Sequence, residues 1–393
     1  MTTRRGHRAL RLAVIHDLAE EGWPSMDQMG RLVATRVPRE SPLIETTIVR
    51  PAMVRMGSRV PLDPGGRLLL ADRIVNRTLL YPRFVRREVA GRFSLYHIVD
   101  HSYAHLVHEL PSAATIVTCH DTDTFRCLVS PAEEPRSRLF RLMANRVLSG
   151  LRRAAAVVCG SEATAAALVR HGLVPEERVR VVPNGIDPEF LREPSAVARE
   201  WAAARLSRGG GAADLLHVGS DIPRKRVDRL LDIAAAVQAA GRPVRLVRVG
   251  APMTEAHRRQ AKRLDLRVLE LPFLDSDVLH AVYERCSVLL LPSDREGFGL
   301  PVLEAFAVGR PVVVSDIPAL REVSGGLARR VAADDIRGWV SAIEQALQPH
   351  DAAAGEYARR AHAASLTWDA HARGLLPVYD EVLDAARGVV RCA

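Results

Sequence analysis

Short apolar runs alternate with amphipathic stretches along the whole chain. A first series of strand-like runs covers Leu10–Ile15, Thr46–Val49, Leu95–Val99, Thr115–Thr118 and Ala155–Cys159, and a second covers Asp214–Val218, Val244–Val249, Arg267–Leu269, Ser287–Leu291 and Pro311–Val314. Helical periodicity lies between them, as at Arg224–Ala240, Ser276–Arg285 and Pro301–Val308. Strands that are apolar on both faces and alternate with helices predict parallel sheets covered on both sides.

The two series predict two domains. Residues 191–213 between them are polar and alanine-rich and contain three consecutive glycines, which weaken any regular element and indicate a linker. We therefore expect Rossmann-like α/β domains over 1–190 and 214–365, joined by a linker over 191–213. Helical periodicity returns near the end, so 366–393 is expected to form a C-terminal helix that packs across the domain interface. Sheets of this kind bind ligands beyond the carboxyl ends of their strands, so two facing domains would form a cleft.

The composition is that of a folded globular protein. Of 393 residues, 48% are hydrophobic and 26% charged, and no apolar run approaches the roughly 20 residues of a membrane span. The N-terminal apolar stretch from Leu12 to Ile15 is shorter than a signal-peptide core. Five cysteines without a paired spacing favour a reducing compartment. We expect a cytoplasmic protein.

The net charge of +9 is concentrated in one segment. Arg50–Arg92 contains ten arginines against three acids, and within it Leu68–Val89 mixes apolar residues with arginines at helical spacing. This pattern is typical first of a solvated helix packed on its own domain, and second of a basic amphipathic helix on an anionic membrane surface. Nucleic acid is not an expected partner, because only 5% of residues are aromatic and no basic motif interleaved with aromatics is present.

The segment 292–304 contains the most specific motif. A buried strand ends at Leu291, a glycine-rich turn follows, and Pro301 suits the first turn of a helix. Such a turn directs free backbone N–H groups and the positive end of a helix dipole at a ligand, which suits a diphosphate. Glu304 has the chemistry to accept hydrogen bonds from the two hydroxyls of a ribose, and Glu296 from those of a hexose. The alternative is a tight turn with two solvated glutamates.

A second motif, over 217–226, places a basic cluster after a strand and a glycine turn. Arg224 and Lys225 would neutralise the charge on a departing nucleoside diphosphate. Lys225 is one of only two lysines in the chain. The alternative is a solvated helix start.

Together these motifs resemble those of the retaining glycosyltransferases of GT-B fold, family 4 (group 1). The block Glu296–Glu304 is similar to that family's signature of two glutamates separated by seven residues, Val181–Asp187 resembles the segment that closes its N-terminal domain, and Leu366–Trp368 resembles the start of its crossover helix. The resemblance implies that Glu304 holds ribose and Glu296 the donor sugar. It also implies donor contacts from Gly219, Arg224, Lys225, Gly297, Phe298, Gly299 and Leu300.

In the N-terminal half, the resemblance implies that His120, which follows a strand, is a catalytic residue that orients the donor sugar or its phosphate. Further residues are expected near acceptor or phosphate: Gly22, Asp100, His101, Asp121 and Ser161. For Asp100 and His101 a structural network is an equal alternative, and Ser161 is first of all a helix N-cap. The pattern Asp121-Thr-Asp123 mimics a metal-binding motif, but we predict no metal, because cations and a helix N-terminus would perform its role.

The sequence therefore predicts a metal-independent retaining glycosyltransferase without a cofactor. Its donor would be a UDP- or GDP-linked sugar, and its acceptor a sugar, a lipid-linked or another glycoconjugate, in polysaccharide or glycolipid biosynthesis. An anionic membrane surface would be a further partner through Arg50–Arg92, at the inner face of the cell membrane. A sugar-nucleotide epimerase of the same fold and a non-catalytic scaffold of a polysaccharide assembly complex remain alternatives.

Overall fold

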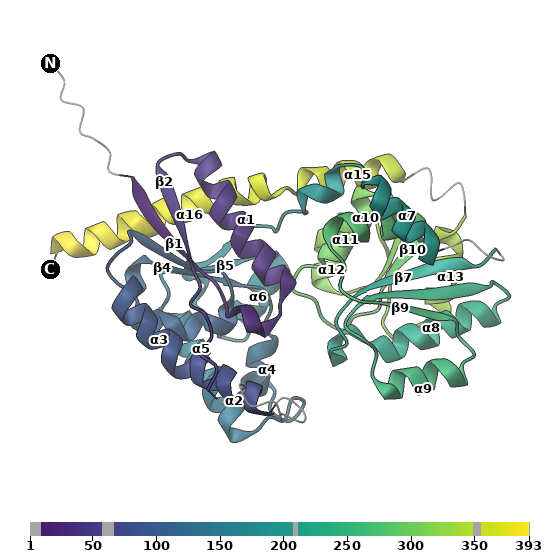
Figure 1. Cartoon of the computed structure of the whole chain (residues 1–393), viewed down its shortest axis with the longest axis horizontal. Helices are drawn as coiled ribbons and strands as arrows, with labels where there is room; N and C mark the ends of the chain where they lie inside the picture. The colour runs from purple at the N-terminus through teal and green to yellow at the C-terminus, as the bar shows by residue number, and fades with distance from the viewer. Residues whose placement is uncertain (1–8, 57–66, 207–210, 349–354, 393) are drawn as a thin grey trace, which may run out of the picture. The chain divides into compact units, whose positions relative to one another are not determined.

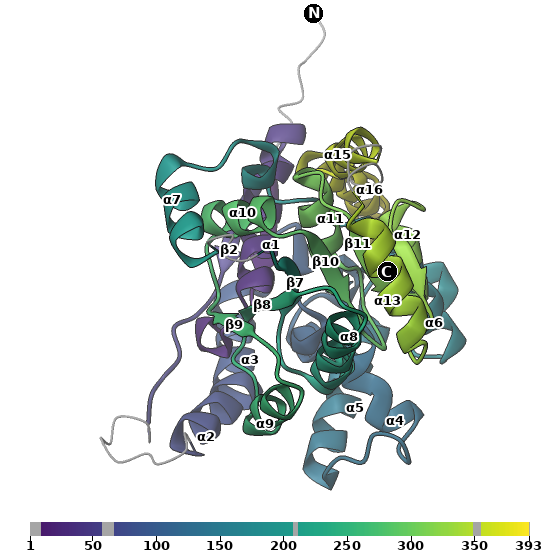
Figure 2. The same cartoon turned by 90° about the vertical axis from the view of Figure 1, so that its right-hand side faces the viewer.

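The chain folds into two compact units in the computed structural model, which describes residues 9–56, 67–206, 211–348 and 355–392. Unit 1 comprises Met1–Pro183 and Trp368–Ala393, and unit 2 comprises Asn184–Thr367. Each unit contains a six-stranded sheet in which all strand pairs are parallel (Figures 1 and 2). The expected fold class of two Rossmann-like α/β domains is confirmed.

The sheet of unit 1 has the strand order β2-β1-β3-β4-β5-β6. The strands are β1 (Leu10–Ile15), β2 (Ile44–Val49), β3 (Leu95–Ile98), β4 (Thr115–Cys119), β5 (Ala156–Cys159) and β6 (Val179–Val181). The helices are α1 (Pro24–Glu40), α2 (Arg67–Val75), α3 (Tyr81–Phe84), α4 (Arg126–Val129), α5 (Arg138–Arg153), α6 (Glu162–Arg170) and α16 (Trp368–Cys392). Two π-helical turns, at Asn76–Leu80 and Val85–Val89, join α2 and α3 into one stretch, and a 3-10 helix covers His101–Glu109.

The C-terminal helix α16 is part of the core of unit 1. Its buried residues Leu375, Tyr379 and Val382 belong to the same apolar cluster as the strands of this sheet. The phenol of Tyr379 forms a buried hydrogen bond of 2.8 Å with Nδ1 of His97 on β3. Because these contacts are internal to unit 1, the helix belongs to the first unit although it follows the second in sequence (Figure 1).

The sheet of unit 2 has the order β12-β11-β10-β7-β8-β9. The strands are β7 (Ala213–Gly219), β8 (Val244–Gly250), β9 (Val268–Leu271), β10 (Val288–Leu291), β11 (Val312–Ser315) and β12 (Arg329–Val331). The helices are α7 (Ala196–Arg205), α8 (Val227–Ala239), α9 (Glu255–Arg263), α10 (Ser276–Arg285), α11 (Leu300–Ala307), α12 (Pro318–Ser324), α13 (Ile336–Ala346) and α15 (Glu356–Ser365).

Alternate residues of the strands in unit 2 enter two different apolar clusters. On β10, Leu289 and Leu291 pack in the cluster with α7, α10 and α11, whereas Val288 and Leu290 pack in the cluster with α8 and α13. A strand with apolar side chains on both faces is stable only when helices cover both sides of the sheet. The unbroken apolar runs of the sequence are therefore explained.

The observed units differ from the expected boundaries in three places. The first unit ends at Pro183 and not at residue 190, and 368–393 returns to it. Of the expected linker over 191–213, residues 207–210 lie outside the described residues. Its described part is not a free linker, because Ala198 and Ala202 of α7 are buried in the core of unit 2.

The expected helix Arg224–Ala240 begins later than predicted. Pro223–Lys225 is a 3-10 turn and α8 starts at Val227, because Arg226 adopts the left-handed conformation with φ 51°. Within the described residues, no helix combines the length and the apolarity that crossing a membrane requires.

Candidate active site

Two loops of unit 2 are tied together at the carboxyl edge of its sheet. One follows β7 and contains Arg224 and Lys225, and the other joins β10 to α11. The backbone N–H of Asp294 donates to the carbonyl of Arg224 at 2.8 Å, and Nη1 of Arg224 donates to the carbonyl of Arg295 at 2.8 Å. The two sequence motifs, some 70 residues apart, therefore form one site.

Glu296 lies at the centre of this site and is almost fully buried. Its carboxylate accepts from Nζ of Lys225 at 2.6 Å, from Nη1 of Arg224 at 3.1 Å and from the hydroxyl of Ser293 at 2.7 Å. Burial alone would raise its pKa, but Lys225 and Arg224 lower the pKa of Glu296 to about 2. The glutamate is therefore ionised, and two cations are held side by side where the sequence predicts a diphosphate.

The turn before α11 requires glycine at position 299. Gly299 is the N-cap residue with φ 105°, and a Cβ there would lie 2.8 Å from Leu320. Leu300 and Pro301 open the helix, Gly297 precedes the turn, and Phe298 is buried in the core of unit 2. At this N-terminus Pro301 has no N–H group, and that of Val302 donates to the carbonyl of Gly299 at 2.9 Å, so the backbone anion site stays a prediction.

Glu304, within α11, has a different electrostatic environment from Glu296. The phenol of Tyr283 on α10 donates to its Oε2 at 2.7 Å. The pKa of Glu304 is raised to about 7: burial is the largest cause and Asp187 adds to the rise, while the hydrogen bond from Tyr283 and the charge of Lys225 oppose it. The carboxyl group therefore changes protonation near neutral pH.

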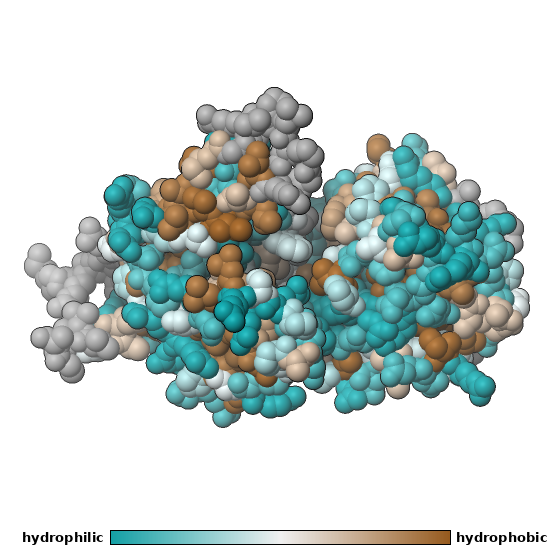
Figure 3. Space-filling view, turned by 90° about the horizontal axis from the view of Figure 1, so that it is seen from below, coloured by the Kyte–Doolittle hydropathy of each residue, from teal (hydrophilic) through white to brown (hydrophobic). Residues whose placement is uncertain are grey.

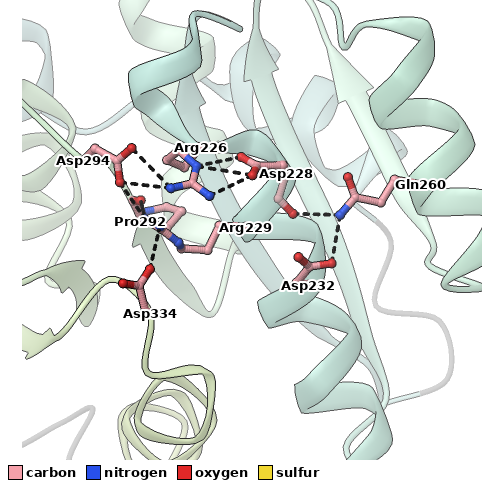
Figure 4. Close-up of polar contacts among 8 residues, drawn as sticks. All are labelled: Arg226, Asp228, Arg229, Asp232, Gln260, Pro292, Asp294 and Asp334. Carbon is pink, nitrogen blue, oxygen red and sulfur yellow. Dashed lines mark hydrogen bonds and ion pairs between the residues drawn. The ribbon is translucent and has the colours of Figure 1, made fainter. Parts of the chain in front are cut away.

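A network of ion pairs supports the loop that presents Arg224 and Lys225 (Figure 4). The guanidinium of Arg226 bridges Asp228 on α8, at 2.9 Å, and Asp294 in the loop after β10, at 3.2 Å. Buried Arg229 also binds Asp294, at 2.8 Å, and Asp334 at 3.0 Å. Arg226 is one of two non-glycine residues with positive φ among the described residues.

Replacing Arg226 by glycine is expected to preserve stability, whereas alanine is expected to cost about 1 kcal/mol relative to glycine. Glycine adopts positive φ without steric cost, while alanine keeps the unfavourable conformation and also loses the ion pairs. These pairs are partly exposed and contribute little on their own. Urea unfolding of the two variants measures the difference. Equal stability would show that the left-handed backbone at this position carries no cost.

In unit 1, the structure brings His120, His101 and Asp121 together after β3 and β4. Nε2–H of His120 donates to the carbonyl of Val99 at 2.7 Å, and its backbone N–H lies 3.3 Å from Nδ1 of His101. Nε2 of His101 lies 3.8 Å from Asp121. Burial lowers the pKa of His120. The neutral ring therefore has its proton on Nε2 and keeps Nδ1 as a hydrogen-bond acceptor.

Three other expected residues of unit 1 have local structural roles. Asp100 caps the 3-10 helix and accepts from the backbone N–H of Ser102 at 2.8 Å. Ser161 is buried and caps α6, accepting from the N–H of Thr164 at 3.1 Å. Gly22 closes an exposed turn with φ 71°, and a Cβ there would meet no atom within 4 Å. Capping a helix does not prevent Asp100 or Ser161 from contacting a ligand as well.

A cluster that the sequence analysis missed follows β1 and β2. His16 and Asp17 come directly after β1, and Nη2 of Arg50, after β2, binds Asp17 at 3.1 Å and also Asp27. His16, Asp17 and Asp27 are close enough to ligate a metal ion, but the Arg50 guanidinium already lies between the two carboxylates. The sequence contained one signal for this cluster, namely that its residues directly follow two predicted strands. The carboxyl ends of parallel strands meet at the ligand-binding edge of a sheet.

Three supporting residues of unit 2 were also missed. Tyr283 and Ser293 hydrogen-bond the two signature glutamates, and His217 lies in buried β7 close to Lys225. Burial, Arg248 and Lys225 lower the pKa of His217 to about 3. A neutral ring adds no positive charge beside the lysine. Sequence spacing contains no signal for these contacts, which depend on packing between elements.

Comparisons with known proteins agree with this fold and site. Residues 212–349 match the family model described as glycosyl transferases group 1, and residues 32–190 match the one described as glycosyltransferase family 4. A D-inositol 3-phosphate glycosyltransferase of Gordonia bronchialis is 29% identical over 244 residues, which cover 58% of this chain and 53% of that protein. The chain spans about half the length of the curated relatives it matches.

Two solved structures share the fold. Sucrose-phosphate synthase from Thermosynechococcus elongatus superposes with a TM-score of 0.71 at 19% identity, covering 96% of this chain and 100% of that one. Anabaena HepE in complex with UDP and glucose gives 0.67 at 16% identity, covering 95% and 100%. Two units, each with a six-stranded parallel sheet, and these solved neighbours show the GT-B class of glycosyltransferase fold. The chain belongs to the group 1 glycosyltransferases of that class.

Proposed function

We propose that the chain transfers a sugar from a nucleoside-diphosphate sugar to an acceptor hydroxyl, with retention of the anomeric configuration. The observation that carries this proposal is the buried carboxylate of Glu296, which holds Lys225 and Arg224 beside the N-terminus of α11. Two cations and a helix N-terminus suit a diphosphate leaving group. They also supply the positive charge that a divalent metal would otherwise provide, which supports a metal-independent reaction.

The donor would be bound by unit 2. Glu304, partly buried and hydrogen-bonded to Tyr283, has the chemistry to accept from the ribose hydroxyls, and Glu296 from those of the sugar. The solved HepE complex contains UDP and glucose, which favours a UDP-linked hexose, with a GDP-linked sugar as the alternative. His120 would orient the donor sugar through Nδ1, because Nε2–H is already engaged by Val99.

Retention is proposed to occur on one face of the sugar. The acceptor oxygen forms its bond to the anomeric carbon as the bond to the diphosphate oxygen breaks, and the hydroxyl proton passes to the departing phosphate. Arg224 and Lys225 would stabilise the charge that develops on this leaving group. The sequence offers no clear carboxylate nucleophile for a covalent intermediate, which is consistent with this route.

The edge of the sheet in unit 1 favours an acceptor rich in hydroxyl groups over a phosphorylated one. The pKa of Asp17 is raised to about 6, mainly by burial and next by the negative charge of nearby Asp100. Asp121 adds a third carboxylate, and Arg50 is already paired with two aspartates. Carboxylates accept hydrogen bonds from hydroxyls and repel phosphate. We therefore propose a neutral sugar or polyol as the accepting group, which glycolipids and polysaccharides both offer.

The test is an assay of diphosphate release with defined substrates. UDP- and GDP-sugars are each combined with myo-inositol, D-inositol 3-phosphate and neutral disaccharides, and the anomeric configuration of any product is read by NMR. We expect release with one donor and a neutral acceptor, and an anomer that matches the donor. An inverted product would contradict the retaining mechanism, and preference for the phosphorylated acceptor would contradict the acceptor class.

The same assay separates the two alternatives. An epimerase would convert the donor sugar into an isomer without any acceptor. A scaffold would bind a nucleotide sugar, seen as a shift in thermal unfolding, and convert none across the acceptor panel.

A further inference from the structure

His101 lies where the loops that follow β3 and β4 meet in unit 1. It begins the 3-10 helix after β3, and only 5% of the residue is exposed. Its Nδ1 lies 3.3 Å from the backbone N of His120, the first residue after β4. Its Nε2 lies 3.3 Å from the hydroxyl of Thr124 and 3.8 Å from the carboxylate of Asp121. One buried imidazole therefore contacts both ends of the loop 120–124.

These contacts define the tautomer of His101. A backbone N–H group only donates, so Nδ1 is the unprotonated nitrogen that accepts from His120. The ring proton is then on Nε2, where the hydroxyl of Thr124 accepts it. Asp100 does not compete for Nδ1, because its Oδ1 lies 3.6 Å away and its carboxylate already accepts from the N–H and the hydroxyl of Ser102. Each ring nitrogen thus has its own partner.

The backbone of His120 depends on this contact because the strand ladder ends before it. The last paired residue of β4 is Cys119, in register with Cys159 of β5. The next residue along, Asp121, is held separately, since its carbonyl accepts from the thiol of Cys119 at 3.2 Å. Without His101, the N–H of His120 would lack its acceptor, and the peptide that carries the catalytic imidazole would be free to rotate.

The 3-10 helix that begins with His101 is itself anchored. The expected helix over Leu68–Val89 is present as α2, α3 and the two π-helical turns. Arg77 in this stretch donates to the carbonyl of Ser102, and the carbonyl of Arg77 accepts from Nε2–H of His105 at 2.8 Å. The helix that presents His101 is therefore held at two successive turns.

The segment Arg50–Arg92, which the sequence suggested for membrane contact, thus has an internal role. Arg73, like Arg77, donates to a backbone carbonyl within unit 1, that of Glu20. Figure 3 shows hydrophobic residues gathered on the underside of unit 1, where α2 lies in Figure 1. Residues 57–66 lie outside the described residues, and contact of the segment with a membrane stays a prediction. The two arginines support the part of unit 1 that carries His101.

We propose that His101 is a positioning residue for sugar transfer, which keeps the imidazole of His120 in the orientation that a bound donor requires. The inference rests on the proposed function, in which His120 orients the donor sugar through Nδ1. His101 acts through the backbone of His120 and not on the donor, because both of its nitrogen atoms are engaged within the protein. Displacing a catalytic group by ~1 Å can lower turnover ~10²-fold, so this single contact has a large effect.

Two variants of similar shape separate the roles of the two ring nitrogens. The carboxamide oxygen of asparagine lies close to the position of Nδ1, so His101→Asn keeps an acceptor for the N–H of His120. Glutamine reaches the position of Nε2, so His101→Gln keeps the donor to Thr124 and loses that acceptor. We expect His101→Gln to lower kcat at least ~10-fold with a smaller change in either KM, and His101→Asn to retain most of the turnover.

A measurement without substrates tests the contact directly. NMR hydrogen exchange of the His120 backbone amide should be slow in the unmodified chain and in His101→Asn, and at least ~10-fold faster in His101→Gln. The nitrogen chemical shifts of the imidazoles should show the proton on Nε2 in both His101 and His120. A protonated or Nδ1–H form of His101 in the unmodified chain would contradict the proposal, because neither can accept from His120.

His105→Gln is the matched control. His105 lies in the same 3-10 helix and is similarly buried, with 7% exposed, and glutamine can reproduce its donation to the carbonyl of Arg77. This variant should change neither turnover nor the exchange of the His120 amide.

The outcomes distinguish this inference from the proposed function. Equal turnover of His101→Gln and His101→Asn would overturn the positioning role. So would fast exchange of the His120 amide in the unmodified chain, even where a variant fails to fold. A raised donor KM with slow amide exchange would show that His101 contacts the donor itself. Absence of sugar transfer in every form would contradict the proposed function, while the exchange rates would still decide whether His101 holds His120.

Discussion

Replacing both Arg224 and Lys225 by alanine is expected to lower turnover by at least ~10²-fold, with a smaller change in donor KM. Removing a single preorganised group that stabilises developing charge typically costs about 10²–10³ in kcat, and here two are removed. The pair lies against Glu296 with contacts of 3.1 and 2.6 Å, so both cations are fixed before the donor binds. Steady-state release of the nucleoside diphosphate measures the effect.

The control must separate chemistry from stability. In the double variant, Glu296 would remain buried without its partners, and breaking a buried ion pair in this way typically costs about 3–5 kcal/mol. Adding Glu296→Gln removes the uncompensated charge, so the triple variant should regain stability but not turnover. Arg258→Ala, which breaks an exposed ion pair with Glu270, should change neither. Near-normal turnover in the double variant would remove these cations from the proposed site.

Much of the fold could be predicted because parallel strands buried on both faces are continuous apolar runs. Runs such as Ser287–Leu291 became strands, here β10, with only their ends displaced. The strands β6 and β12 were missed, because each has three residues and includes arginine, so neither forms an apolar run. Both are edge strands, which pair on one side only.

The alanine-rich segment shows why the linker prediction failed. The polar, alanine-rich composition of residues 191–213 suggested a flexible linker, yet alanine has the highest helix propensity of all residues. Ser195 caps α7 by accepting from the N–H of Ala198 at 3.1 Å, a start signal that could have been recognised. What the sequence does not contain is the surface on α10 that buries Ala198 and Ala202.

The donor half of the site was more predictable than the other half. In unit 2 each motif combines a strand end, a glycine turn and a charged residue, so short segments specify the local geometry. In unit 1, His16 and Asp17 lack a glycine turn, and their significance depends on Arg50 from another strand. The pKa values of Glu296 and Glu304 likewise depend on partners remote in sequence, Lys225 and Tyr283.

Donor affinity is expected to fall as the pH decreases through about 7, because Glu304 becomes protonated there. Its pKa is raised to about 7, so the carboxylate that would accept from the ribose hydroxyls predominates only above that pH. Glu304→Gln should weaken donor binding ~10–100-fold at pH 8, the loss of one to two hydrogen bonds to a charged group, and should abolish the pH dependence. Titration calorimetry with a nucleotide sugar is suitable, since a free diphosphate has a terminal phosphate that itself titrates near pH 6.

The stability of the unliganded protein should decrease as the pH rises, whereas donor affinity should increase. A carboxyl group whose pKa is higher in the folded state than in the unfolded chain binds its proton more tightly when folded. Its contribution is therefore present at low pH and is lost as the pH rises from about 4.5 to 7.

Tyr283→Phe removes a hydrogen bond that lowers the pKa of Glu304. The variant should therefore move the pH midpoint of donor binding and the pH midpoint of the stability change upward. Among the described residues, Glu304 is the one side chain to which this phenol donates a hydrogen bond. A donor-binding midpoint that stays unchanged in the Tyr283 variant would therefore show that another group controls the pH dependence.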